Sequence, residues 1–446
     1  MAIVHLRHPL RGLAGDQERV EVAGEDVRVV VRELEERYPG TAGWILDETG
    51  DLRPHVSVFV GGEKARVDSK IGPDDEIYIL HAISGGSDDT AELLVGTHKG
   101  LFVLRGERGG PMEVATRAFE GQDVEFAMRD PRSGTYIASV THGQFGPRIY
   151  LSDDPTGEWS QAKGPAFPED TGTALTRTWV VTKGEEDGVL WAGVDPAALF
   201  KSEDSGRSWE LVRGLWDHPS RPDWQPGGGG LALHSICTWP GEPDRVTVGI
   251  SAAGIWHTDD GGATWRRGGK GIVPRYLPDD AGEDAKMALC IHNMHRAPLE
   301  PATLYMQFHG GVYRSDDSGD NWNEIGLPSG LPSDFGFPIV VDPADPDSAY
   351  VIPLTADLDR VTEGGKLVVY ETRDRGATWT ARTEGLPGKD AYLTILRQSF
   401  CHDGRSPLGL YFGATSGEVF GSGDAGKTWT SVARDLAPVL SVRCSS

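Results

Sequence analysis

The sequence predicts a small α+β domain followed by an all-β propeller. The chain has 446 residues, which is enough for two or three domains. It contains 59 glycines and 29 prolines, about a fifth of all residues, and this turn-rich composition is typical of many short strands. A tryptophan-containing motif returns about every 50 residues from residue 152 onward, which suggests propeller blades. Residues 1–86 lack this motif and form a separate domain in our interpretation.

Strand patterns flank one helical pattern in residues 1–86. Apolar and polar residues alternate in four short segments, which predicts strands at 3–6, 19–22, 55–60 and 75–81. Segment 26–38 instead places Val27, Val30, Val31, Leu34 and Tyr38 on one helical face. Carboxylates at its start favour the helix dipole, and Pro39-Gly40 ends the pattern. The predicted order is strand, strand, helix, strand, strand.

This order resembles the β-grasp fold of ubiquitin-like sulfur carriers, the MoaD/ThiS family and especially its CysO-like branch. The resemblance is carried by ELEERYPG (33–40), HVSVFVGGEKAR (55–66) and DEIYILHAISGG (75–86). It implies that a terminal Gly-Gly enters the narrow channel of an adenylating enzyme. The last glycine then becomes an acyl-adenylate and afterwards a thiocarboxylate. On this basis Gly86 carries the sulfur and Gly85 provides clearance, because glycine has no side chain to clash.

One departure from that family is decisive for function. Gly86 is followed by Ser87, and residues 87–90 are predicted to link the first domain to a propeller at 91–446. A peptide-bonded carbonyl cannot become a thiocarboxylate, so either a protease cuts after Gly86 or the domain serves as a docking module. The resemblance implies as partners a MoeB/ThiF-like adenylating enzyme that uses ATP, a sulfur-accepting biosynthetic enzyme and, if the chain is processed, a JAMM-type protease. It implies no tightly bound cofactor.

The repeated motif lies at 152–159, 202–209, 258–265, 315–322, 372–379 and 422–429. It resembles the Asp-box of sialidase-like (BNR) propellers, with Ser202, Asp204, Gly206 and Trp209 as one example. The aspartate can accept turn N–H groups, the glycine can take a positive φ, and the tryptophan can pack on the sheet. We therefore expect these aspartates to stabilise the turns and to have no catalytic role. The first motif should form a different turn, because it contains Pro155 and Gly157.

Six motifs allow six or seven blades, and seven is favoured. Residues 93–104 are predicted to form a strand pair that lacks the motif, and 438–443 a last strand that can pair with it. Pairing the two ends of the propeller would close the ring and remove open sheet edges.

The mouth of the central channel is the expected binding site of the propeller. Predicted inner strands 124–131, 177–181, 231–237, 291–298, 335–343 and 393–399 supply Arg177, Trp179, His234, His292, His295 and Arg397. The loop 215–230 adds Trp216 and Trp224, which could stack on a flat or sugar-like ligand. These histidines and His309 could ligate a metal, but hydrogen-bonded imidazoles are favoured and no metal is expected. The F/Y-R-I-P motif of sialidases is missing, which argues against sialidase activity.

Composition excludes several classes of partner. The formal net charge is −24, which disfavours nucleic acid and anionic membranes. Four scattered cysteines, no apolar run long enough to span a bilayer and no signal peptide predict a cytoplasmic protein. Three functions remain: a sulfur-carrier precursor, an uncleaved fusion with a binding propeller, or a hydrolase acting on a glycoside, a metabolite or the carrier itself.

Overall fold

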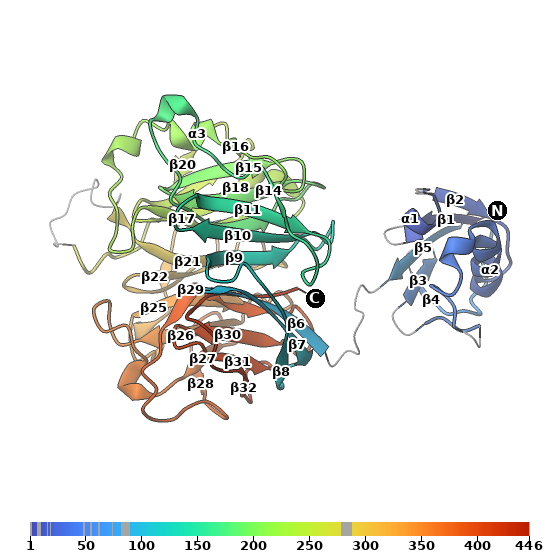
Figure 1. Cartoon of the computed structure of the whole chain (residues 1–446). Coiled ribbons are helices and arrows are strands. Elements are labelled where there is room, and N and C mark those ends of the chain that lie inside the picture. The colour runs from blue at the N-terminus through green and yellow to red at the C-terminus, as the bar shows by residue number, and fades with distance from the viewer. Residues whose placement is uncertain are drawn as a thin grey trace. The chain divides into compact units, whose positions relative to one another are not determined.

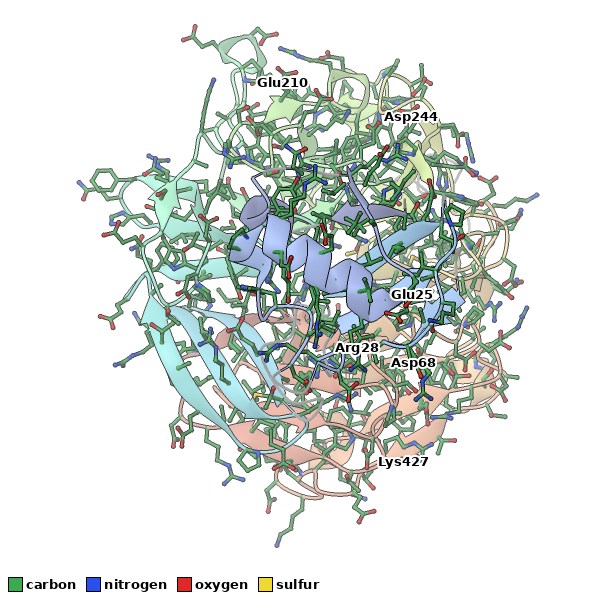
Figure 2. All side chains as sticks on the ribbon, turned by 90° about the vertical axis from the view of Figure 1, so that its right-hand side faces the viewer. Glu25, Arg28, Asp68, Glu210, Asp244 and Lys427 are labelled. Atoms are coloured by element: carbon green, nitrogen blue, oxygen red, sulfur yellow. The ribbon has the colours of Figure 1, made fainter. Side chains whose placement is uncertain are left out.

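The computed structural model describes residues 2–6, 10–15, 17, 19–47, 50–53, 56–60, 63–73, 75–81, 90–277 and 288–445. Gly85 and Gly86 lie outside the described residues. The chain forms two compact units, Met1–Asp88 and Asp89–Ser446, and both are drawn in Figure 1. Exposed charged side chains occur on both units, for example Glu25 and Asp68 on the first and Glu210, Asp244 and Lys427 on the second (Figure 2).

The N-terminal unit is a β-grasp domain, as the sequence predicted. Its sheet has the order β2-β1-β5-β3-β4, with β1 parallel to the central strand β5 and the other neighbours antiparallel. The strands are β1 (Ala2–Leu6), β2 (Arg19–Val22), β3 (Val56–Val60), β4 (Glu63–Ala65) and β5 (Glu76–His81). The short strand β4 and the single turns α1 (Leu10–Leu13) and η1 (Pro39–Thr41) were not predicted, because they are too short to show a periodicity.

The helix α2 (Val27–Arg37) covers this sheet with the predicted apolar face. Asp26 is its N-cap, and the Asp26 carboxylate accepts the Val29 N–H at 3.1 Å. The buried face consists of Val27, Val30, Val31 and Leu34, which join one core with Ile77 and Ile79 of β5. Burial of this face, rather than helix propensity, stabilises so short a helix.

The C-terminal unit contains five four-stranded antiparallel sheets and one eight-stranded sheet within the described residues. The first sheet comprises β9 (Asp123–Arg129), β10 (Tyr136–His142), β11 (Gly146–Ser152) and β12 (Ser160–Gln161). The second comprises β13 (Arg177–Lys183), β14 (Leu190–Asp195), β15 (Ala198–Ser202) and β16 (Glu210–Leu211). The third comprises β17 (Ala232–Trp239), β18 (Glu242–Ser251), β19 (Gly254–Thr258) and β20 (Arg266–Arg267).

The remaining sheets continue the same pattern. The fourth comprises β21 (Ile291–Arg296), β22 (Leu304–Phe308), β23 (Gly311–Ser315) and β24 (Asn323–Glu324). The fifth comprises β25 (Phe335–Val341), β26 (Ala349–Leu354), β27 (Val369–Thr372) and β28 (Thr380–Arg382). The eight-stranded sheet joins β29 (Ile395–His402), β30 (Leu410–Ala414), β31 (Val419–Ser422) and β32 (Thr430–Ala433) to β33 (Val439–Cys444), β6 (Thr90–Thr97), β7 (Gly100–Glu107) and β8 (Met112–Ala118).

The eight-stranded sheet is two blades joined at their inner edges, so the propeller has seven blades. β33 pairs antiparallel with β6, with Val442 opposite Val95, and touches β29 at one parallel bridge. The first and last strands of the propeller therefore share a blade, as predicted. The inner strands β33, β9, β13, β17, β21, β25 and β29 contact one another in a closed ring, and Figure 1 shows the sheets around it.

The repeated aspartate motif forms the same turn in its last five copies. In the copy at 202–209, the Asp204 carboxylate accepts the Ser208 N–H at 2.8 Å, Gly206 has φ 86°, and Trp209 is buried. The aspartates of these five copies accept hydrogen bonds in the same way: Asp204, Asp260, Asp317, Asp374 and Asp424. The first copy departs, because Asp154 accepts from Thr156 and Gly157 lacks a positive φ.

Short helical turns complete the propeller. They are η2 (Glu169–Thr171), α3 (Arg213–Trp216), η3 (Arg221–Asp223), η5 (Leu327–Ser329) and η6 (Glu363–Gly365). All but η6, which lies between two strands of the fifth sheet, connect blades, and none was predicted, because each spans a single turn.

Candidate functional site at the propeller axis

Every inner strand of the propeller carries a register irregularity. In each of the seven inner strands, the register with a neighbouring strand shifts and one or more residues are left out of the pairing. Such bulges re-aim side chains and occur next to binding sites. Each blade leaves at least one position of its inner strand unpaired. We take one such position from each blade: Glu125, Trp179, His234, His292, Phe337, Arg397 and Leu440. We call these seven residues the axial ring.

Arg397 links members of the axial ring across the propeller. Its guanidinium carbon lies 6.0 Å from the ring centre of Trp179 and 4.6 Å from that of Phe337. The strands of Arg397 and Trp179, β29 and β13, are not neighbours in the ring of inner strands, so their side chains meet over the axis. No carboxylate lies within ion-pair distance of Arg397 among the described residues, and its Nε is buried without a hydrogen-bond partner. The site therefore offers a positive charge to an anion.

Two side-chain amides bridge the axis beside Arg397. The Asn293 amide donates to the Arg397 carbonyl oxygen at 2.6 Å, and the Gln398 amide donates to the His234 carbonyl oxygen at 2.9 Å. These bonds join β21, β29 and β17 directly. They tie the backbone of two members of the axial ring, Arg397 and His234, to side chains of other inner strands.

Arg177 and two acids form a second charged group beside Trp179. Arg177 lies 3.7 Å from Glu125 and 3.9 Å from Asp195, and its guanidinium carbon stands 4.9 Å from the ring centre of Trp179. Burial raises the pKa of both carboxyl groups, although Arg177 acts in the opposite direction. Nothing in the sequence distinguishes these two acids from the other 65 acidic residues.

His234 and His292 are buried members of the axial ring. Burial lowers the pKa of both imidazoles well below the ordinary value, and the charge of Arg397 lowers it further. The His292 Nδ1 lies 2.6 Å from the Gly336 carbonyl oxygen, which fixes Nδ1 as the protonated nitrogen. The His234 Nε2 is buried without a hydrogen-bond partner.

Three of the expected site residues lie elsewhere. His295 is influenced by Arg443 and His402 and not by Arg397, because it lies three residues from His292 along β21 and its side chain points to the opposite face. Trp224 is buried against Trp256 with ring centres 5.4 Å apart, and Trp216 packs on Phe167 at 4.7 Å. Trp224 belongs to a hydrophobic core shared by neighbouring blades, and Trp216, which is half-buried, packs against that core. The structure thus brings together Arg177, Trp179, His234, His292 and Arg397.

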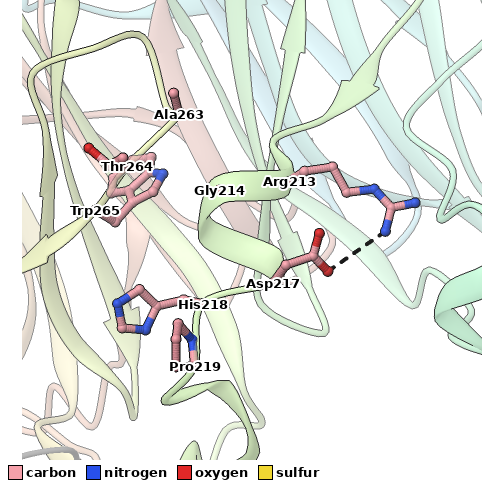
Figure 3. A pocket seen from close by; sticks show the side chains of 8 residues that line it. All are labelled: Arg213, Gly214, Asp217, His218, Pro219, Ala263, Thr264 and Trp265. Atoms are coloured by element: carbon pink, nitrogen blue, oxygen red, sulfur yellow. Dashed lines mark ion pairs between the residues drawn. The ribbon is translucent and has the colours of Figure 1, made fainter.

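A surface pocket of about 410 Å³ lies at the outer strands of two neighbouring blades. Figure 3 shows α3 on one side of it and Trp265 on the other, with the ion pair between Arg213 and Asp217, 3.7 Å apart, at its rim. The pocket is lined by Arg213, Gly214, Asp217, His218, Pro219, Ala263, Thr264 and Trp265. It is distant in the fold from the axial ring, since it lies beside strands β16 and β20.

The turn aspartates have the properties of structural groups. Hydrogen bonds from Thr264 lower the pKa of Asp260 to about 2, and those from Thr378 lower that of Asp374. A carboxylate held ionised in this way cannot act as a general acid near neutral pH. The expectation that these residues are structural therefore agrees with their geometry.

Three possible metal ligands lie together near the axial ring, at positions that the sequence did not single out as a group. The ligand atoms of Cys290, His292 and His309 lie within 4.8 Å of one another. All four cysteines of the chain are free thiols.

The fold and the sequence comparisons define the two parts of the molecule as an N-terminal β-grasp domain and a β-propeller. Residues 4–86 match the ThiS family, and the N-terminal domain is therefore a ThiS family domain. Two solved structures match 19% of this chain over their full length, each with a TM-score of 0.18. They are the Amycolatopsis orientalis BexX/CysO complex, 24% identical, and Mycobacterium tuberculosis CysO, 26% identical.

The propeller is similar to glycoside hydrolases, but only over part of their length. It matches an oligoxyloglucan-reducing end-specific xyloglucanase of Emericella nidulans, 24% identical over 221 residues, which are 43% of this chain and 26% of that protein. An ancestral GH74 enzyme of known structure is 16% identical with a TM-score of 0.47, over 76% of this chain and 40% of the enzyme. The chain thus spans well under half of these relatives. No described helix is long and apolar enough to cross a membrane.

Proposed function

We propose that this protein is the precursor of a sulfur carrier. The observation that carries the proposal is the ThiS match, which ends at Gly86. Gly86 follows the central strand β5 by five positions, so the Gly-Gly pair occupies the place of a carrier tail. The strand β5, from which this tail continues, is paired with β1 on one side and β3 on the other.

The proposed chemistry needs three steps. A protease, of the JAMM type in our proposal, hydrolyses the Gly86–Ser87 peptide bond and frees the Gly86 carboxylate. A MoeB/ThiF-like enzyme then lets this carboxylate attack the α-phosphorus of ATP, and pyrophosphate leaves. A sulfur donor finally displaces AMP to give the thiocarboxylate, which a biosynthetic enzyme consumes. We place these steps in the cytoplasm, where ATP is available and thiols such as the four cysteines stay reduced.

Intact-mass spectrometry of the protein from its native host tests this proposal. We expect a fragment that ends at Gly86, part of it with one oxygen replaced by sulfur. Gly86→Ala should abolish the sulfur-containing species, because a methyl group on the last residue would clash in a narrow channel. Gly143→Ala is the matched control, since a Cβ at Gly143 meets no atom within 4 Å. Uncut chain alone, in cells that contain the activating enzyme, would contradict the proposal.

An uncleaved fusion is the second candidate. In it the β-grasp domain docks the propeller onto sulfur-transfer enzymes while the axial ring holds a ligand. The short segment between the domains favours it, because a short tether limits their separation. Undiminished function of Gly86→Ala in cells would select this candidate.

A hydrolase activity of the propeller is supported by one observation at the axis. Glu125 and Asp195 flank Arg177, and paired carboxyl groups with unequal surroundings are the machinery of glycoside hydrolysis. Release of reducing sugar from a glycan panel, lost in Glu125→Gln but kept in Glu113→Gln on the exposed strand β8, would support it. No release by the wild-type protein would exclude it for those substrates.

A further inference from the structure

Cys290, His292 and His309 have the chemistry and the spacing of a metal site. Their ligand atoms lie within 4.8 Å of one another, Cys290 and His292 are buried, and His309 is half-buried. One thiolate and two imidazoles form a borderline-soft set, which suits Zn²⁺. We propose that these three residues bind one Zn²⁺ ion and leave its fourth coordination position open. This inference concerns the propeller and does not depend on the carrier chemistry.

The hairpin β21–β22 positions the three ligands. Cys290 directly precedes β21, His292 is its second residue, and His309 directly follows β22. The His309 N–H donates to the Cys290 carbonyl oxygen at 3.1 Å, which pins the two ends of the hairpin together. Cys290 and His292 are two residues apart, so they share a face of the strand, and the bulge at His292 adjusts its direction.

In each of the two histidines, one ring nitrogen lies near an oxygen atom of the protein, and the other nitrogen remains for the metal. The Gly336 carbonyl oxygen accepts the proton of His292 Nδ1 at 2.6 Å, which leaves Nε2 to bind a metal. His309 Nε2 lies 3.6 Å from the Asp357 carboxylate. A carbonyl or a carboxylate on the second nitrogen is the usual support of a ligating histidine.

Aromatic rings fix the two imidazoles against each other. The rings of His292 and His309 are 5.3 Å apart, and Phe335 lies 5.3 Å from each of them. Tyr276 packs on His309 at 4.9 Å, and its hydroxyl accepts the Cys290 N–H at 3.0 Å. The site is therefore rigid before a metal arrives, which lowers the entropic cost of binding.

Ser251 and Gly227 lie directly against the Cys290 thiol. Ser251 Oγ lies 3.3 Å from Cys290 Sγ. Gly227 covers both groups, and a Cβ at that position would meet each of them at 3.4 Å. Three protein ligands with one open position characterise catalytic rather than structural zinc sites. The Arg397 guanidinium packs on Phe337 at 4.6 Å, and the Phe337 ring lies 4.9 Å from that of His292, so its positive charge favours an anion such as a carboxylate at the open position.

Cobalt titration of the reduced, metal-free full-length protein tests the site. We expect one Co²⁺ per chain, with a thiolate-to-cobalt charge-transfer band and intense tetrahedral d–d bands that Zn²⁺ abolishes. Cys290→Ser should remove the charge-transfer band, and Asp357→Asn should weaken binding by about 10- to 100-fold. Cys237→Ser and His295→Asn are matched controls, because they change a buried thiol and a histidine of the same strand outside the cluster.

Two further readouts keep the test decisive. Zn²⁺ should slow alkylation of Cys290 by iodoacetamide in the wild type, measured by peptide mass spectrometry, and should leave the rate unchanged in His309→Asn. Acetate should alter the d–d bands of the cobalt protein, and less so in Arg397→Gln. The proposal is overturned if Co²⁺ gives no thiolate band, or if Cys237→Ser and Cys290→Ser lose it equally. Thermal melting of each variant separates loss of binding from loss of folding.

Discussion

A buried ion pair next to the closing blade offers the sharpest test of the propeller. Arg108 follows β7, and its Nε lies 2.5 Å from the carboxylate of Asp403, which follows β29. Both side chains are largely buried, with exposed fractions of 11% and 0%. Arg108 also donates to the carbonyl oxygens of Gly423 and Pro407. The pair thus ties the first hairpin of the propeller to the neighbouring blade at the point where the ring closes.

Replacing Arg108 by Met should destabilise the propeller by about 3 kcal/mol. Breaking a buried pair costs about 3–5 kcal/mol, because one charge remains buried without its partner. The lower end applies here, since Asp403 keeps the N–H groups of Arg405 and Gly409 at 3.0 and 2.8 Å. For a domain of this size, 3 kcal/mol corresponds to a decrease in Tm of roughly 5 °C.

Calorimetry of the full-length protein measures this decrease. Arg105→Met is the matched control, because Arg105 pairs with Glu92 on the surface and is 49% exposed, so its loss should cost less than about 1 kcal/mol. The double variant Arg108→Met/Asp403→Asn should recover part of the loss, since no unpaired charge remains. Equal Tm values for Arg108→Met and Arg105→Met would refute the reasoning.

The same pair predicts a pH dependence. Hydrogen bonds from Arg108 and two backbone N–H groups lower the pKa of Asp403 below its ordinary value, although burial acts in the opposite direction. A carboxyl group whose pKa is lowered in the folded state stabilises that state at any pH above its unfolded-state pKa of about 4. This stabilisation is lost as the pH falls further. The Tm difference between wild type and Arg108→Met should therefore be constant from pH 7 to 5 and shrink below about pH 4. A difference that grows on acidification would contradict this sign.

Three further predictions concern single elements. Asp260→Asn should lower the Tm by roughly 1–2 °C at pH 7, and because the pKa of Asp260 is about 2, this difference should vanish as the pH falls from 4 toward 2. Asp26→Ala should remove the cap of α2 and cost about 1 kcal/mol, seen as about fivefold faster exchange of the Val29 amide, whereas unchanged exchange would exclude the cap. Val442→Asp should place an unpaired carboxylate at a fully buried position of β33 and open the ring, detected as rapid proteolysis near the C-terminus, and a resistant variant would argue against closure through β33.

The two halves of the proposed function rest on different parts of the chain. Carrier chemistry depends on Gly86 and its release, while a metal or an anion at the axis depends on side chains of β13, β21 and β29. Loss of the cobalt spectrum in Cys290→Ser with an intact thiocarboxylate would show that the parts act independently.

The sequence by itself determined what depends on local periodicity and on repetition. The helical face of Val27 to Leu34 specified α2, and the motif copies specified the blades, because each pattern is complete within a few dozen residues. Closure through the last strand was also predictable, since a ring leaves one strand of the repeat unmatched. The order of strands and helix in residues 1–86 predicted the β-grasp domain.

The tertiary structure alone decided the composition of the axial site. Trp216 and Trp224 have the residue type of a binding loop, yet Trp224 is buried in a core between blades and Trp216 packs against that core. Glu125 and Cys290 carry no local signal, and the sequence offered His309 only as one of several histidines that could ligate a metal. The fold groups them: Glu125 of β9 meets Arg177 of β13, and the hairpin β21–β22 brings Cys290 and His309 together. The bulge that places His292 in the axial ring depends on pairing with β22. Such placement follows from contacts between residues distant in sequence, which no local pattern encodes.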